Sequence, residues 1–255
     1  MIITSILKAQ KFFVVMGDRL REFVYAALVA GVVLLAGCSG LPLADQQTPT
    51  AQPTVENFSY PSGWSQTGIT DLTVALGTHD KAVENVSRKS RLVVTDEDSN
   101  RTVVRTVDTD TRTGSIRFID TQFDDDVHTY YSAEGVFEYD RTTEELHRMP
   151  DENWTVTEIA TTAGLERPLR HLEVNATEVV TVEGTTAVRY TVIGIRNPDS
   201  VPANTATGHV TVAEEGFIAE YSITRGNDGF TRQTRYDLSA LGNATVRRPA
   251  WMPEE

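Results

Sequence analysis

The sequence has one cysteine, Cys38, and only four lysines in 255 residues. With a single cysteine no disulfide can form within the chain, so disulfides contribute nothing to the fold. Acidic residues outnumber basic ones by 36 to 23, which gives a formal net charge of −13. No basic stripe is present that could neutralise phosphates, and we therefore expect no nucleic-acid partner. The 40% of apolar and 8% of aromatic residues are ordinary for a globular protein.

Motifs of catalytic and metal sites are also missing. The five histidines form no H-x-H or H-E-x-x-H pair, and there is no glycine-rich phosphate loop or dinucleotide fingerprint. The stretch GWSQTG at 63–68 departs from the G-x-S-x-G nucleophile elbow by one residue. The acidic run Asp124–His128 could offer oxygen ligands to Ca²⁺ or Mg²⁺, but it equally suits a solvated hairpin turn, which we favour. We predict no enzyme, no cofactor and no metal.

The scarcity of lysine and the excess of acidic residues indicate the salt concentration in which the protein works. An acidic, lysine-poor surface suits concentrated salt, in which the Debye length shrinks to about 3 Å and self-repulsion is screened. We therefore predict a halophilic protein. An acidic extracellular protein from an ordinary organism is the alternative.

The lone cysteine follows an apolar run at residues 23–36, FVYAALVAGVVLLA. The run is shorter than the about 20 residues that span a bilayer, but with Arg19 and Arg21 before it, it is typical of a signal peptide. Leu35-Ala36-Gly37-Cys38 resembles the lipobox of lipoprotein signal peptides, which implies that Cys38 is lipidated and becomes the first residue. We predict a signal peptide at 1–37. Its true start is Met1 or, as we favour, Met16, because the stretch from Met16 to Cys38 already forms a complete signal peptide. An uncleaved transmembrane anchor is the alternative.

The remaining chain divides by composition. Residues 38–66 are rich in Pro, Thr, Gln and Ser, as in an extended tether. Residues 67–255 are predicted to form one extracytoplasmic domain. Its first element is a helix at about 70–84, capped by Thr70 with Asp71 in the first turn.

From residue 86 the apolar period becomes two. Six short strands up to residue 149, with polar connections, predict an antiparallel meander. A second helical stretch at about 155–173 is broken at Gly164 and Pro168, and five more strands follow between residues 177 and 238. We predict an α+β fold, a curved antiparallel half-barrel of about ten to eleven strands with two helical segments packed on one face.

This order of segments resembles two groups of proteins. The lipobox, tether, meander, helical insertion and an ending of the type Arg235-Tyr236-Asp237-Leu238 then Arg248-Pro249-Ala250-Trp251 are similar to haloarchaeal membrane lipoproteins. The element order also resembles the LolA/LppX-like half-barrels, and this resemblance implies a module that carries or senses lipids or acylated proteins at an envelope.

Aromatic residues alternate with polar ones on the predicted strands and would line one face of the sheet. They pack as a core beneath the helices or, alternatively, line a cavity for an apolar ligand. The candidate ligand-lining residues are Phe118, Tyr131, Phe137, Tyr139, Phe217, Tyr221 and Tyr236.

Six of the nine asparagines lie in N-x-[ST] sequons, more than composition predicts, as expected of an exported glycoprotein. Asn-rich turns beside Thr-rich strands would give the same excess. The candidate glycosylation sites are Asn57, Asn85, Asn100, Asn153, Asn175 and Asn243.

We therefore expect a lipoprotein anchored to the membrane through its lipid, on the extracytoplasmic face. Two functions fit it. The first is a non-enzymatic binding or carrier module for a lipid or other apolar ligand, which predicts a cavity. The second is a structural or sensory cell-envelope protein that binds another protein, which predicts a filled core and an exposed apolar patch.

Overall fold

The computed structural model describes residues 53–149 and 164–253. The predicted signal peptide, Cys38 and Asn153 lie outside the described residues. Within the described ranges no helix is long and apolar enough to cross a membrane.

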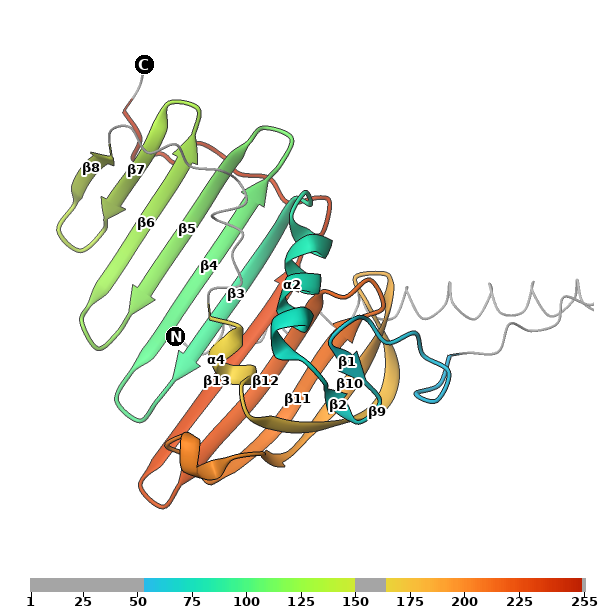
Figure 1. Ribbon diagram of the computed structural model, residues 1–255. Helices are drawn as coiled ribbons and strands as arrows, with labels where there is room; N and C mark the ends of the chain where they lie inside the picture. Colours follow the sequence, from blue (N-terminus) through green and yellow to red (C-terminus); the bar gives the residue numbers. More distant parts are fainter. Residues whose placement is uncertain (1–52, 150–163, 254–255) are drawn as a thin grey trace, which may run out of the picture. The chain divides into compact units, whose positions relative to one another are not determined.

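One antiparallel sheet of eleven strands dominates the domain, in the order β8-β7-β6-β5-β4-β3-β13-β12-β11-β10-β9. The sheet is two meanders joined where β13 pairs with β3, and Figure 1 shows it curved and unclosed. The predicted α+β half-barrel with ten to eleven strands is therefore confirmed. The first meander contains β3 (Arg88–Thr95), β4 (Asn100–Asp108), β5 (Thr113–Asp120), β6 (Asp125–Ser132), β7 (Gly135–Asp140) and β8 (Glu145–Met149). The second contains β9 (Leu172–Val182), β10 (Thr185–Ile195), β11 (Thr205–Ala213), β12 (Ile218–Asn227) and β13 (Phe230–Ser239).

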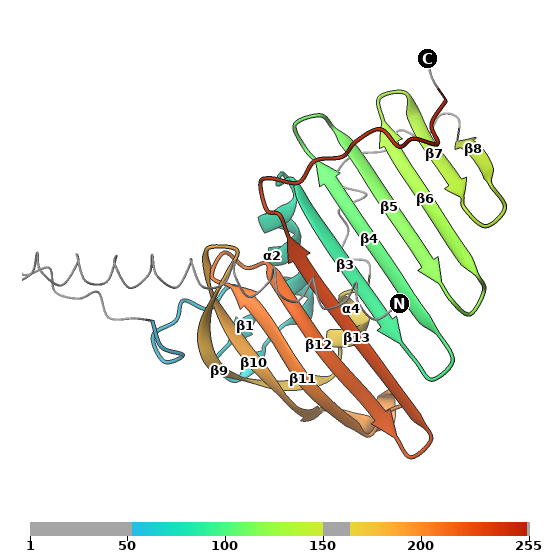
Figure 2. The ribbon, with the colours of Figure 1, turned by 180° about the vertical axis from the view of Figure 1, so that it is seen from behind.

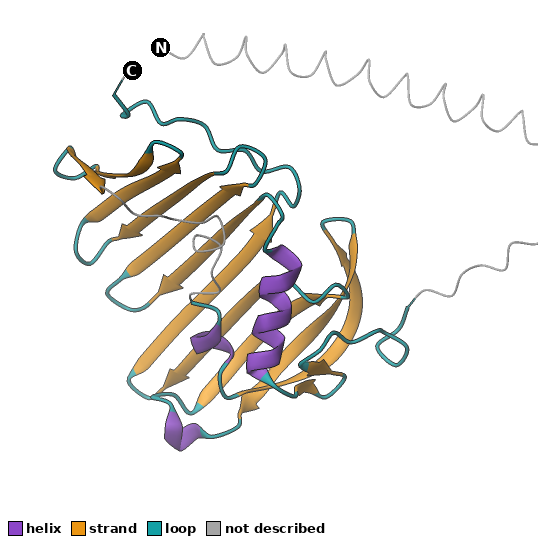
Figure 3. Ribbon diagram, turned by 45° about the horizontal axis from the view of Figure 1, so that its top comes forward, coloured by secondary structure: helices purple, strands orange, loops and turns teal. Residues whose placement is uncertain are grey.

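The two α-helices of the described residues, α2 (Leu72–Val83) and the short α4 (Glu166–Leu169), lie on the same side of the sheet. Figure 3 shows them in purple against the orange strands. We call this side of the sheet the helix face. A two-stranded hairpin, β1 (Trp64–Ser65) and β2 (Gly68–Ile69), lies beside β9, and a 3₁₀ turn at Pro198–Ser200 connects β10 to β11.

The helix α2 begins one residue later than the sequence suggests. Asp71, not Thr70, is its N-cap, because the Asp71 carboxylate accepts a hydrogen bond of 3.0 Å from the backbone N–H of Val74. The prediction that Thr70 caps the helix is wrong, although the helix itself is where its apolar spacing places it.

The second predicted helix can be compared with the structure only from residue 164 on, because its first part, at 155–163, lies outside the described residues. Between residues 164 and 173, Glu166–Leu169 is the helical part. Leu172 already begins β9. The assignment of 172 and 173 to a helix is wrong, because the period-two pairing of Leu172 and Val174 with β10 prevails over the apolar spacing.

The main core lies on the helix face of the second meander. Its buried residues include Ala75 and Val83 of α2, Leu169 of α4, and Val188 and Ile223 of the strands. Phe58 and Trp64 are buried in the same core, and the Trp64 ring lies 5.0 Å from the ring of Tyr190. The packed unit therefore extends upstream of residue 67, into the segment that we assigned to the tether.

The opposite face of the first meander has its own small core. The C-terminal segment after β13 crosses these strands in the rear view (Figure 2). Met252 packs there against Tyr130 and Phe137, and Trp251 stacks on Tyr139 with ring centres 5.3 Å apart. The sheet is thus covered on different faces in its two halves.

Candidate functional site

A pocket of about 710 Å³ opens on the helix face, partly exposed to solvent, between α4 and the ends of β3, β4, β12 and β13. Its volume falls within the about 300–1,000 Å³ of small-ligand sites. The apolar and small residues that line it are Leu92, Val94, Gly164, Pro168, Val201, Pro202, Ala203, Ile223 and Phe230. Its polar lining consists of Asp96, Ser99, Arg101, Glu166, Arg167, Arg170, His171, Arg225, Arg232 and Thr234.

The strand register sorts this lining along the sheet. Val94 of β3 pairs with Thr234 of β13, which pairs with Ile223 of β12. One step nearer the hairpin ends, Arg232 pairs with Arg225. Because side chains two residues apart on a strand share a face, Leu92, Val94 and Ile223 form the apolar part of the pocket floor. Arg101 and Thr234 lie in the same row as Val94, and Arg225 and Arg232 lie at the hairpin end.

The segment 164–171 forms one wall, and apolar packing and hydrogen bonds to strand β12 hold it in place. Two of its own side chains, Leu165 and Leu169, are buried. The Arg225 guanidinium donates to the carbonyls of Arg167, Pro168 and Arg170 at 3.3, 2.7 and 2.6 Å. These are carbonyls at the end of α4 that no helical N–H reaches, so Arg225 closes this helix end.

Two further arginines of the pocket are paired with carboxylates. Arg232 forms a bidentate pair with Asp96 at 2.6 and 2.9 Å, and this hydrogen-bonded carboxylate raises the pKa of Arg232. Arg101 donates two hydrogen bonds to the buried Asp120, whose pKa the guanidinium lowers. The bidentate pair holds Arg232 and Asp96 in one planar geometry, whereas both N–H groups of Arg101 meet the single Oδ2 of Asp120.

None of the seven predicted ligand-lining aromatic residues lines this pocket. Tyr221 and Tyr236 are buried and stacked, with ring centres 5.5 Å apart, and burial raises the pKa of both phenols. Phe217 is also buried in the main core. In these three the structure shows core packing.

The other four predicted aromatics fall on two faces. Phe118 and Tyr131 are half-buried on the helix face of the first meander, where Phe118 lies 5.9 Å from the Arg101 guanidinium. Phe137 and Tyr139 pack on the opposite face against the C-terminal segment. The expectation of one shared face is therefore wrong for Phe137 and Tyr139, because their register in β7 is offset from that of Tyr131.

The arginines of the pocket were missed in the sequence, although a signal exists. In YSITRGN, Tyr221, Ile223 and Arg225 share one strand face, and in FTRQTRY the same holds for Phe230, Arg232 and Tyr236. An arginine on the apolar face of a strand indicates a charge that is paired with another group or that serves a site, because unpaired charges are rarely buried.

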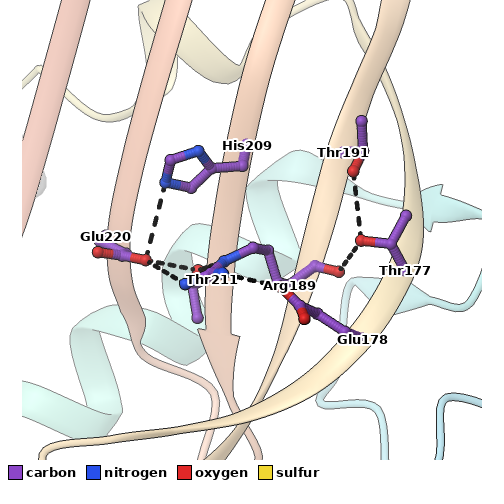
Figure 4. A network of polar contacts seen from close by, with 7 residues as sticks. All are labelled: Thr177, Glu178, Arg189, Thr191, His209, Thr211 and Glu220. Carbon is purple, nitrogen blue, oxygen red and sulfur yellow. Dashed lines mark hydrogen bonds and ion pairs between the residues drawn. The ribbon is translucent and has the colours of Figure 1, made fainter.

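A second polar cluster lies on the opposite face of the second meander (Figure 4). Arg189 donates to Glu178 at 2.7 Å and to Glu220 at 3.1 Å, and Thr211 donates to Glu220 at 3.0 Å. His209 lies 3.7 Å from Glu220, and Thr177 and Thr191 are hydrogen-bond partners at 3.2 Å. The strand register shifts at Arg189/Tyr190 and at Thr211/Val212. We interpret the cluster as cross-strand pairing that ties bulged strands together.

Of the acidic run Asp124–His128, only Asp124 lies in the turn between β5 and β6, and Asp125–His128 belong to β6, so the favoured hairpin turn describes only the start of the run. Asp126 is paired with Arg117 at 2.8 Å, and His128 accepts a hydrogen bond of 3.0 Å from the indole N–H of Trp251. Over residues 53–149 and 164–253, no group of three or more His, Cys, Asp or Glu side chains is arranged to hold a metal ion.

The five described sequon asparagines are all exposed. Asn57 and Asn85 are in loops, Asn100 and Asn175 are in strands, and Asn243 follows β13. Their exposure is compatible with glycosylation, which stays a prediction.

No family model matches this chain, and no curated protein matches it. Among solved structures it is similar to the lipoprotein LppX of Mycobacterium tuberculosis, with 10% identity and a TM-score of 0.35 over 69% of this chain and 97% of that one. It is also similar to LprF from Mycobacterium bovis, with 11% identity and a TM-score of 0.36 over 71% and 97%. A LolA superfamily protein from Nitrosomonas europaea matches with 7% identity and a TM-score of 0.26 over 69% and 94%.

Proposed function

We propose that this chain is a non-enzymatic binding or carrier module for a lipid or other apolar ligand. The observation that supports it is the pocket on the helix face, whose floor of Leu92, Val94 and Ile223 is apolar. An apolar floor favours a hydrocarbon because binding removes the apolar surface of both the floor and the ligand from water.

The same proposal places the domain outside the cell membrane, held by a lipid on Cys38. The support is in the sequence: an apolar run of signal-peptide length, a lipobox at Leu35–Cys38 and a tether composition after it. A membrane-anchored carrier would meet its ligand at the membrane surface. The halophilic, haloarchaeal origin belongs to the same proposal and rests on the acidic, lysine-poor composition.

The alternative, a protein that binds an envelope partner, predicts an exposed apolar patch. The large apolar side chains exposed in the described residues lie on four different segments: Val74 on α2, Phe123 in a turn, Leu146 on β8 and Ile193 on β10. This distribution, together with the pocket, favours a small ligand.

Filling the pocket tests the proposal. Val94→Trp places an indole where the apolar floor now lies, so delipidated full-length protein should lose most of its uptake of the methyl ester of cis-parinaric acid. Uptake is measured as the rise in probe fluorescence at high salt.

The matched control is the adjacent residue. Val93 is half-buried on the opposite face of the same strand and does not line the pocket, so Val93→Trp should bind the ester as the wild type does. Near-UV circular dichroism shows whether each variant is folded. Absence of uptake by the wild type, or equal uptake by both variants, would contradict the proposed function.

A further inference from the structure

The pocket concentrates positive charge in an acidic protein. Five arginines line it, although acidic residues exceed basic ones by 36 to 23 in the chain. Three of the five have carboxylate partners: Arg101 with Asp120, Arg232 with Asp96 and Arg170 with Glu166. For the other two, Arg167 and Arg225, the structure shows no carboxylate partner within residues 53–149 and 164–253.

Arg225 is the more buried of the two unpaired cations. Its Nη atoms donate only to neutral carbonyls, and its Nε is buried without a hydrogen-bond partner among the described residues. Burial and the nearby charge of Arg167 both lower its pKa. Carbonyl dipoles orient a guanidinium but do not cancel its charge, so this site favours an anion.

Arg167 is positioned to meet that anion. Arg167 lies on α4, and its carbonyl accepts a hydrogen bond from Arg225. The side chain of Arg167 is exposed and lines the pocket. Two like charges held close together are unfavourable in the empty pocket and favourable once an anion binds between or beside them.

The position of the apolar lining residues relative to the arginines indicates where the hydrocarbon part of a ligand would lie. Arg225 and Arg232 pair one step nearer the hairpin ends than Val94 and Ile223, and Leu92 lies one step further along β3 toward α2. Arg101 pairs with Val94, and its charge is already met by Asp120. We propose that the pocket binds an amphiphile with an anionic group, a carboxylate or a phosphate, at Arg167 and Arg225, and with its hydrocarbon chain over Leu92, Val94 and Ile223. This inference rests on the proposed function and adds the charge of the ligand to it.

The test compares cis-parinaric acid with its methyl ester, which has the same chain but no charge. Delipidated full-length wild-type protein should bind the acid more tightly than the ester. Arg167→Gln should weaken binding of the acid about threefold to tenfold, as expected for a partly exposed charge-assisted contact, and leave the ester within about twofold.

Arg247→Gln is the matched control. Arg247 is exposed on the C-terminal segment, next to Val246, which packs on the opposite face of the sheet. This variant makes the same change in net charge and should bind both probes as the wild type does. Equal losses in Arg167→Gln and Arg247→Gln would attribute the effect to overall charge and overturn the inference.

Failure of the inference can be distinguished from failure of the proposed function. Equal affinity of the wild type for acid and ester, unchanged in Arg167→Gln, overturns the anionic site but leaves an apolar pocket. Absence of binding of both probes removes the proposed function and the inference together.

A third arm separates an amphiphile from a small free anion. Inorganic phosphate at the concentration of the acid should not displace the acid, because phosphate has no chain to bury on the apolar floor. Displacement by phosphate as effective as that by unlabelled fatty acid would show a plain anion site and would overturn the hydrocarbon half of the proposal.

Discussion

Single buried polar side chains tie the helices to the sheet. His79 of α2 is 2% exposed, and its Nδ1 accepts a hydrogen bond of 2.9 Å from the backbone N–H of Ile218 at the start of β12. Arg88 is 4% exposed and donates to the carbonyls of Val83, the last residue of α2, and of Val86, which follows the helix. His79 satisfies a buried backbone N–H, and Arg88 adds a donor to the Val83 carbonyl, which also accepts from the backbone N–H of Val86.

His79 should make the stability depend on pH. Burial and the charge of Arg88 lower the pKa of His79 to about 4, against about 6.5 in an unfolded chain. The unfolded state therefore binds the proton more tightly, and stability that is fully present above pH 6.5 falls as the pH drops toward 4. The loss amounts to roughly 3 kcal/mol at full protonation.

The variant His79→Gln isolates this contribution, because a glutamine oxygen can still accept from Ile218 but cannot titrate. Chemical denaturation of both proteins between pH 4 and pH 7 at constant salt gives the difference in unfolding free energy. As the pH falls, the unfolding free energy of the wild type should decrease more than that of His79→Gln. Parallel curves would show that His79 does not titrate in this range.

At the same residue scale, alternation on the strands predicts which side chains share a face, but it does not predict their environment. The alternation of Tyr221, Ile223 and Arg225 is visible in the letters. Whether Arg225 faces solvent or a helix end depends on α4, which is 57 residues away along the chain at Pro168. Long-range packing of this kind is absent from local patterns.

At the scale of elements, the strands could be predicted more completely than the helices. The meanders follow from period-two alternation between polar turns, since each strand buries part of one face. The stretch around Leu165 and Leu169 has apolar residues at helical spacing, yet from residue 164 on, where the structure describes it, only Glu166–Leu169 is helical. The short α4 is held by Arg225 and buried leucines, so tertiary contacts and not propensity determine its length.

Gly164 should be the most sensitive position of this wall. Its φ is +103°, and an added Cβ would lie 2.8 Å from Cδ2 of Leu92 on the pocket floor. Gly164→Ala should therefore lower stability by the left-handed backbone cost of about 1–2 kcal/mol plus a further ~1 kcal/mol or more from overpacking. It should also weaken probe binding by narrowing the pocket.

Gly184→Ala provides the control, because Gly184 has a φ of +81° but open space around its Cβ. It should show the backbone cost alone and bind the probe normally. Guanidinium denaturation and probe titration measure both effects. Equal destabilisation of the two variants would indicate that Leu92 moves away without cost.

At the scale of the whole molecule, the two halves of the sheet have separate cores on opposite faces. The helix face of the second meander is covered by α2, α4 and the β1–β2 hairpin, and the opposite face of the first meander is covered by the C-terminal segment. In the sequence this last segment is a Pro-bounded tail without a periodic apolar pattern. Its packing could not be predicted, because it contacts strands more than 100 residues earlier, as Trp251 does at His128.

This arrangement predicts that the C-terminal cover can be loosened without loss of the ligand site. Trp251 stacks on Tyr139 and donates to His128, both in the first meander, whereas the pocket is on the helix face. Trp251→Ala should lower stability by roughly 2–4 kcal/mol through lost aromatic burial. It should speed hydrogen exchange of β6 and β7 amides more than that of β12 and β13 amides, and leave probe affinity within about twofold.

Trp251→Phe, which keeps a ring on Tyr139 but loses the indole N–H, should be intermediate in stability. Uniform acceleration across all strands, or loss of probe binding in Trp251→Ala, would show instead that the two cores act as one cooperative unit.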